Sequence, residues 1–127
     1  MAGATYDTGA LLAADRSDRR LWAIHARLVA RGVVPTVPAP ALAEAWRGHA
    51  RQASLSRLLA LCVVEPLTEE QARAVGVLAG RAGHADIVDV TVVEGAIRRG
   101  DGIVTSDPDD LRRIADAAHA VLSIEAV

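Results

Sequence analysis

The sequence predicts an α/β fold in three layers, with helices on both sides of a mostly parallel sheet of about five strands. Short β-branched runs alternate with longer segments of helical periodicity along the whole chain. No internal repeat, low-complexity tract or linker interrupts this alternation. The chain of 127 residues is therefore expected to form one domain, 1–127, that is long enough to bury a hydrophobic core.

The first half of the chain is expected to hold three strands and four helices. The apolar runs that predict strands are 2–6, 33–37 and 62–65. The segments that predict helices are 9–14, 21–31, 41–51 and 54–61. Gly32 is expected to end the second helix, and Pro38 and Pro40 to lead into the third.

The second half is expected to hold three helices and two strands. Thr68 begins a capping-box pattern, which predicts a helix from there to about Arg81, closed by Gly83. The segment 86–99 is apolar on most faces, and its length favours a buried helix over a strand pair. A strand at 103–105, a helix beginning at Asp107-Pro108 and a final strand at 120–124 complete the order.

The composition excludes several kinds of chemistry. All 14 basic residues are arginine, so no lysine-dependent mechanism applies. The single cysteine, Cys62, cannot form an internal disulfide, and it fits a reduced, cytoplasmic setting. The first residues resemble neither a secretory signal nor a membrane span.

Acidic residues follow the predicted strands, where open parallel sheets gather their functional residues. Asp7 follows the first strand and Asp107 follows the strand 103–105. Asp86 and Asp89 lie one helical turn apart at the start of the buried helix, and Glu44 lies early in the helix after the second strand. We expect these side chains to converge at one edge of the sheet.

Each acid also has a structural alternative. Asp107 and Asp86 could be N-caps of their helices, Glu44 a solvated surface charge and Asp7 a turn residue before Gly9. The case for function is therefore collective. Several negative charges brought together are unfavourable unless a cation lies among them, and a set of oxygen ligands selects Mg²⁺ or Mn²⁺. Asp7, Asp86, Asp89 and Asp107 are the candidate ligands. Such a site suits phosphodiester hydrolysis.

The sequence resembles the PIN-domain ribonucleases. Thr5-Tyr6-Asp7-Thr8, Ala43-Glu44, Asp86-Ile87-Val88-Asp89 and Thr105-Ser106-Asp107 are similar, in that order, to the four acidic motifs of the family. The resemblance covers essentially the whole chain and implies a three-layer PIN-like fold with Asp7, Glu44, Asp89 and Asp107 as catalytic acids. Asp89 is preferred over Asp86 because the apolar helix follows it. Gly9 departs from the family, which often has asparagine there.

A free-standing domain of this size looks like a VapC-type toxin. That resemblance implies a Mg²⁺-dependent endoribonuclease, a structured RNA as substrate, a homodimer and a small cognate antitoxin. A receiver domain of a response regulator is a less suitable alternative, because it normally needs a lysine that this chain lacks. A PIN-like module that binds RNA or a partner without cutting it is the second alternative.

Contact with RNA would depend on local arginines, since the net charge is −2. Arg47 and Arg51 are expected on the helical face of Glu44, and Arg112 is a third candidate. The pairs Arg98–Arg99 and Arg112–Arg113 are further candidates, with a solvated helix surface as the alternative. Trp22 and Trp46 are expected in the core, with base stacking or dimer contact as alternatives. Among the four histidines, only His84 lies near a candidate acid, Asp86.

Overall fold

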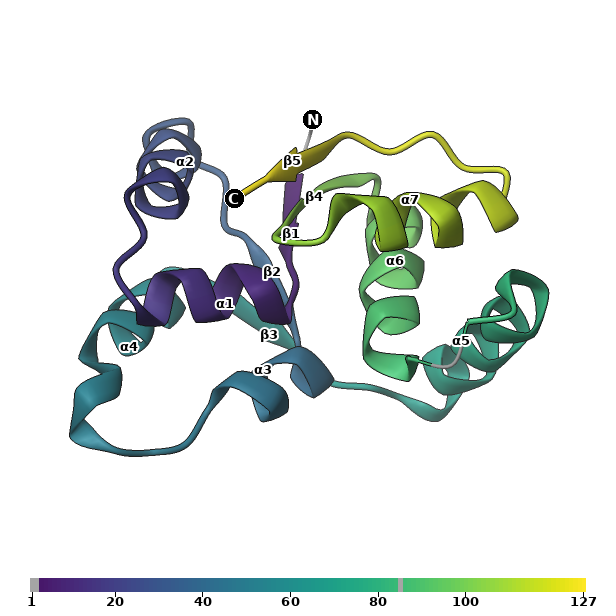
Figure 1. The fold of residues 1–127 in the computed structure, drawn as a ribbon, viewed down its shortest axis with the longest axis horizontal. Coiled ribbons are helices and arrows are strands. Elements are labelled where there is room, and N and C mark those ends of the chain that lie inside the picture. Colours follow the sequence, from purple (N-terminus) through teal and green to yellow (C-terminus); the bar gives the residue numbers. More distant parts are fainter. Residues whose placement is uncertain (1–2, 85) are drawn as a thin grey trace.

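The computed structural model describes residues 3–84 and 86–127. One sheet of five strands separates helices of the first half of the chain from helices of the second half (Figure 1). Every strand pairing in the described residues is parallel, which confirms the predicted three-layer α/β architecture. Ala2, where the sequence placed the start of the first strand, lies outside the described residues.

The elements follow the predicted order. The strands are β1 (Gly3–Tyr6), β2 (Thr36–Pro38), β3 (Val63–Glu65), β4 (Asp101–Thr105) and β5 (Ile124–Ala126). The helices are α1 (Thr8–Asp15), α2 (Arg19–Ala30), α3 (Ala39–Ala45), α4 (Ala53–Leu59), α5 (Glu69–Ala82), α6 (Ile87–Arg99) and α7 (Pro108–Ala117), with a short 3₁₀ turn, η1 (Ala50–Gln52), before α4. Within the described ranges, no helix combines the length and apolarity needed to cross a bilayer.

Several predicted boundaries are wrong. The second strand begins at Thr36 rather than at residue 33, because the Val33 amide still closes α2 by donating to the Leu28 carbonyl. The final strand begins at Ile124 rather than at residue 120, after a left-handed turn at His119. The third helix ends at Ala45 instead of continuing to residue 51, because the side chain of Gln52 binds the backbone that follows.

The strand order is β3-β2-β1-β4-β5. From β1 the chain runs through α1 and α2 to β2, and then through α3 and α4 to β3, all on one side of the sheet. It then crosses to the other side through α5 and α6, enters β4 next to β1, and continues into α7. The helices that follow β1 and β4 therefore leave on opposite faces. In open parallel sheets, functional sites lie at such a reversal, outside the carboxyl ends of the two strands, and this place is called the crevice below.

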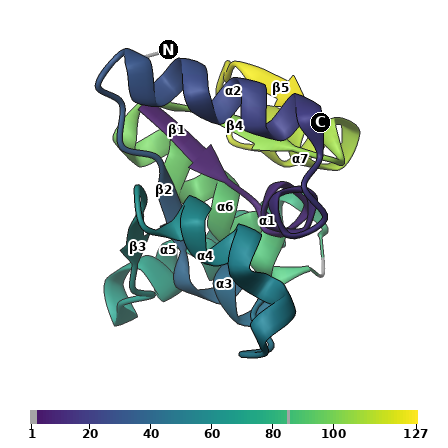
Figure 2. The ribbon, with the colours of Figure 1, turned by 90° about the vertical axis from the view of Figure 1, so that its left-hand side faces the viewer.

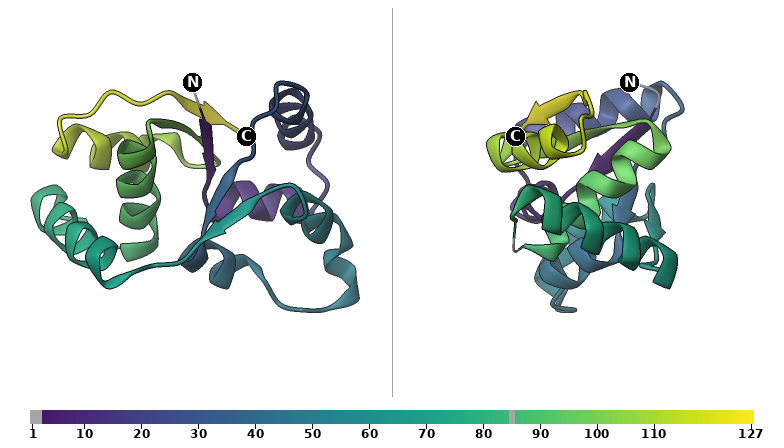
Figure 3. Two further views of the ribbon diagram at one scale, coloured as in Figure 1. Left: turned by 180° about the vertical axis from the view of Figure 1, so that it is seen from behind. Right: turned by 90° about the vertical axis from the view of Figure 1, so that its right-hand side faces the viewer.

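The alternation of side chains along β4 serves two separate cores. Val104 joins Ala4 and Tyr6 of β1 in the core under α1–α4 (Figure 2), while Ile103 belongs to the core under α5–α7 (right view of Figure 3). The buried Tyr6 hydroxyl lies 2.8 Å from Nδ1 of His25, and burial lowers the pKa of this histidine. Both cores are built almost entirely from aliphatic side chains.

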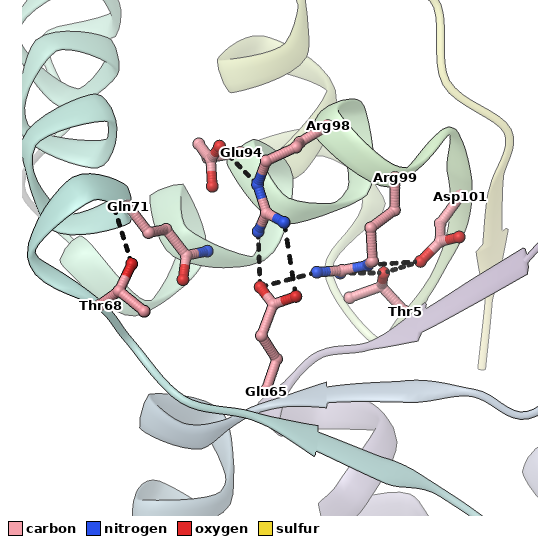
Figure 4. Close-up of polar contacts among 8 residues, drawn as sticks. All are labelled: Thr5, Glu65, Thr68, Gln71, Glu94, Arg98, Arg99 and Asp101. Atoms are coloured by element: carbon pink, nitrogen blue, oxygen red, sulfur yellow. Dashed lines mark hydrogen bonds and ion pairs between the residues drawn. The ribbon is translucent and has the colours of Figure 1, made fainter.

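The C-terminal end of α6 is fixed to the sheet by an arginine network (Figure 4). Arg99 donates to Asp101 at 2.9 Å and to the Thr5 hydroxyl at 2.8 Å. Its third nitrogen, Nη1, lies 2.9 Å from Glu65, close enough for an ion pair but without the alignment of a hydrogen bond. Arg98 pairs with the same Glu65 at 2.5 Å and with Glu94 at 3.3 Å. The network connects β1, β3, β4 and α6.

Two glycines provide the space that this network occupies. A Cβ at Gly95 would lie 2.8 Å from Nη1 of Arg99, and a Cβ at Gly3 would collide with the Asp101 carboxylate. Helix α6 begins beside the acidic residues, so its attachment to the sheet at Arg99 also helps to position its first turn.

We expect Arg99→Met to destabilise the fold by about 3 kcal/mol, because it leaves the buried Asp101 carboxylate without its charged partner. Adding Asp101→Asn should recover part of that loss. Arg73→Met removes an ion pair whose two side chains are each 80% exposed, so it should cost less than about 0.5 kcal/mol. Chemical denaturation measures all three. Equal losses for Arg99→Met and Arg73→Met would contradict a structural role for the network.

Candidate active site

Asp7 lies directly after β1, at the point where the strand order reverses. Its Oδ1 accepts the Ala10 amide at 2.8 Å and so caps helix α1. Its Oδ2 accepts a short hydrogen bond from the Thr105 hydroxyl at the end of β4. The residue is only 5% exposed. Asp7 is thus a buried carboxylate held by donors from two elements.

Thr105 orders two acids at once. Besides donating to Asp7, its hydroxyl oxygen accepts the Asp107 amide at 2.9 Å. Only one local feature indicates this role, namely a hydroxyl two residues before an aspartate. Its partner across the sheet could not be deduced without the strand pairing.

Asp107 is the N-cap residue of α7, as the sequence predicted, but its side chain forms no capping hydrogen bond. Pro108 is the first residue of the helix, where a missing amide hydrogen costs nothing. The Asp107 side chain is exposed to solvent. Asp110, in the first turn of α7, pairs with Arg113.

Asp86 and Asp89 come to the crevice from the first turn of α6. Asp86 accepts the amides of Val88 at 3.0 Å and Asp89 at 3.2 Å, so the N-cap alternative for Asp86 is confirmed. The Asp89 carboxylate instead faces His84, whose Nε2 lies 3.4 Å from it. This division of roles favours Asp89 over Asp86 as the third acid of the site.

The pKa of Asp7 shows that the acids influence one another. Burial, together with the nearby carboxylates of Asp89 and Asp107, raises it to about 6, despite the opposing hydrogen bonds from Thr105 and Ala10. Burial also raises the pKa of Asp89, and the charges of Asp86 and Asp107 act in the same direction. Asp7, Asp89 and Asp107, which lie after β1, in the first turn of α6 and after β4, therefore share one electrostatic environment.

Glu44 reaches the site from α3 through one contact. The Thr8 hydroxyl, next to Asp7, donates to Glu44 at 2.6 Å. Thr8 was not singled out as a functional residue from the sequence. The contact links the exposed side chain of Glu44 to the first residue of α1, beside Asp7.

Gly9 explains the departure noted in the sequence. A Cβ at this position would lie 2.9 Å from Cβ of Ser106 and 3.2 Å from its amide nitrogen. Glycine therefore lets the first turn of α1 approach the loop that carries Thr105 and Asp107. The Asp7 loop is stabilised by this approach and by Thr105.

The arginines next to the crevice are arranged differently from the prediction. Because α3 ends at Ala45, Arg47 and Arg51 are not on the helical face of Glu44, and that expectation is wrong. Arg112 is exposed on α7, as a surface residue should be. Arg98, Arg99 and Arg113 are engaged in ion pairs.

The tryptophans differ from each other. Trp22 is partly buried against the first core, near His25 and Arg57, as expected. Trp46 is 41% exposed, so the expectation that it lies in the core is wrong. It directly follows the last residue of α3, and its backbone is extended rather than helical.

The donor chemistry of the crevice fits a hard divalent cation. Its side chains offer carboxylate and hydroxyl oxygens, and the raised pKa of Asp7 reports crowded negative charge that a cation would relieve. Within residues 3–84 and 86–127, however, no three His, Cys, Asp or Glu side chains already stand close enough to hold one ion. The fit lies in the chemistry of the donors and not in a preformed ligand cage.

Known structures share this fold. The chain is similar to a chain in the crystal structure of VapBC2 from Rickettsia felis bound to a DNA fragment from their promoter, with a TM-score of 0.72 and 16% identity. The alignment covers 98% of both chains. No protein-family model matches the sequence, and no curated protein matches it. The predicted PIN-like fold is confirmed at this level.

We expect Asp7→Asn to stabilise the metal-free protein at neutral pH. A folded-state pKa raised to about 6, from an ordinary value of 3.8, means that ionised Asp7 disfavours folding. Its favourable contribution is complete below pH 4 and is lost as the pH rises through 6. The variant should therefore gain on the order of 2 kcal/mol at pH 8 and nothing at pH 4.

Thermal unfolding in EDTA at both pH values measures this difference, with Asp116→Asn on the exposed side of α7 as the matched control. Added Mg²⁺ should raise the melting temperature of the wild type more than that of Asp7→Asn. A variant less stable than the wild type at pH 8 would contradict the inference that ionised Asp7 destabilises the fold.

We expect Gly9→Ala to destabilise the protein by about 1 kcal/mol or more, since the new methyl group pushes Ser106 away from α1. Gly76→Ala in α5 is the control, because a Cβ there meets nothing within 4 Å. It should stabilise the protein by up to about 1 kcal/mol through helix propensity. Stabilisation of both variants would show that the approach of Gly9 to Ser106 is not needed.

Proposed function

We propose that this protein is a metal-dependent endoribonuclease that hydrolyses RNA phosphodiester bonds with Mg²⁺, or Mn²⁺, bound at the crevice. The observation that supports this most directly is the raised pKa of buried Asp7 beside Asp89 and Asp107. A chain does not gain stability by burying acids together, so their arrangement indicates a site that a cation completes.

The acids would have different roles in the reaction. Asp7, Asp89 and Asp107 would hold the cation, with Asp86 as an outer acid because its Oδ1 is occupied by the cap of α6. The bound ion would lower the pKa of a water molecule and neutralise the scissile phosphate. Glu44, whose carboxylate accepts the Thr8 hydroxyl, would accept a proton from the attacking water.

Local cations would bind the RNA backbone. Arg47, Arg51 and Arg112 are exposed on the elements that follow Glu44 and Asp107. Phosphate binding needs positive charge near the crevice and not over the whole surface, so the net charge of −2 is compatible with an RNA substrate.

The toxin half of a toxin–antitoxin pair is the biological role we propose. One structural neighbour is a chain of VapBC2 bound to a DNA fragment from its promoter, and the sequence motifs resemble the VapC-type toxins. By extension, this chain would form a homodimer and bind a small cognate antitoxin that blocks the acidic crevice.

Incubation of the purified protein with a mixed RNA pool and Mg²⁺ or Mn²⁺ tests the activity. We expect cleavage that EDTA abolishes and that Asp7→Asn or Asp107→Asn lowers at least about 100-fold. Asp116→Asn should cleave normally. Equal cleavage by the wild type and Asp7→Asn would refute the mechanism. RNA binding without cleavage under either metal would favour the non-catalytic alternative.

A further inference from the structure

The loop between α3 and α4 joins an exposed aromatic side chain to a segment free of negative charge. Residues 45–64 contain Arg47, Arg51 and Arg57 and no acidic residue, whereas all 16 acidic residues lie elsewhere in the chain. The loop extends at the rim of the molecule, directly after the helix that carries Glu44 (Figure 1).

Trp46 is unusual in a chain with so few aromatic residues. The sequence has two tryptophans, one tyrosine and no phenylalanine. Tyr6 is fully buried and Trp22 is partly buried, so Trp46 is the exposed aromatic side chain among the described residues. An indole that stays 41% exposed forgoes much of the burial that usually stabilises a fold.

The backbone around Trp46 is held in place by the buried side chain of Gln52. Gln52 Oε1 accepts the amides of Arg47 at 2.7 Å and Gly48 at 3.0 Å. Its Nε2 donates to the Ala45 carbonyl at 2.9 Å. Gln52 is 2% exposed, and these three bonds end α3 at Ala45. The loop is therefore ordered by a side chain that contributes nothing to its outer surface.

Two further contacts fix the loop. Arg47 Nη1 donates to the Trp46 carbonyl at 2.7 Å, which draws the guanidinium back over the end of α3. Gly48 has a left-handed φ of 77°, and a Cβ there would lie 3.5 Å from the Trp46 indole nitrogen. Trp46, Arg47 and Gly48 are consequently presented as one preordered surface, which lowers the entropy cost of binding.

We propose that Trp46 is a base-stacking residue that selects single-stranded RNA for the neighbouring acidic crevice, with Gln52 as its positioning residue. The inference depends on the proposed ribonuclease function. An indole offers its face to any unpaired base, whereas the bases of a duplex are already stacked on each other. The adjacent arginines supply charge for the phosphates, and the absence of acids in 45–64 removes local repulsion.

Binding can be measured without hydrolysis. Fluorescence anisotropy in EDTA would follow a labelled 12-nucleotide oligo(A) or oligo(U) RNA and a duplex of the same length. We expect Trp46→Ala to weaken single-strand binding about ten-fold, and Trp46→Phe to retain most of it. Val121→Ala, at a fully exposed apolar residue, is the control and should bind as the wild type does. Duplex binding should be weaker and unaffected by Trp46→Ala.

Intrinsic fluorescence gives a second readout. The difference spectrum between the wild type and Trp46→Phe isolates Trp46, and oligo(U) should quench it with saturation. Gln52→Leu should lower both the RNA affinity and the fluorescence anisotropy of Trp46, while circular dichroism reports whether the fold persists. Loss of folding in this variant would leave the Trp46 variants to decide the question.

The outcomes separate this inference from the proposed function. Trp46-dependent binding without cleavage by any metal-loaded protein would contradict only the nuclease activity. Cleavage that depends on Asp7, with equal RNA affinity for the wild type and Trp46→Ala, would overturn the stacking role. That second result would leave the loop as a surface for a protein partner.

Discussion

The hydrogen-bonded hydroxyl of Thr105 holds together the two strand ends from which the acidic crevice is built. It donates to Asp7 after β1 and accepts from the backbone of Asp107 after β4. The helices after these strands leave on opposite faces of the sheet, so chain topology opens the crevice at this point. The contact between Gly9 and Ser106 limits that opening. Asp7 is buried as a result, and its pKa rises.

The order of the elements could be predicted because each signal was local. β-branched runs, the capping box at Thr68 and the terminating glycines depend on neighbouring residues alone. The boundary errors arise from backbone conformations and contacts that a periodic pattern does not show. Helical spacing continues beyond Ala45, but Gln52 binds the next amides and ends α3. No local sequence pattern marks Gln52 as the residue that ends the helix.

The candidate site, like the fold, could be predicted only in part from the sequence. The positions of the acids followed from strand ends and helix starts, and the sequence left open whether Asp86 or Asp89 faces the crevice. Hydrogen bonding separates the two, because Asp86 is the cap. The groups that orient the acids, Thr8 and Thr105, depend on contacts with residues 36 and 98 positions away. Periodicity within a segment carries no information about such pairs.

Helix α6 provides an internal comparison of acids with and without partners. At its C-terminal end, Glu65, Glu94 and Asp101 are each matched by Arg98 or Arg99. At its N-terminal end, within the described residues, Asp7, Asp89 and Asp107 pair with no arginine, and His84 is the one basic side chain in contact with them. The same chain thus neutralises buried acids where they are structural. Among the described residues, it leaves Asp7, Asp89 and Asp107 without an arginine partner at the carboxyl ends of β1 and β4. That is where the proposed chemistry needs a cation.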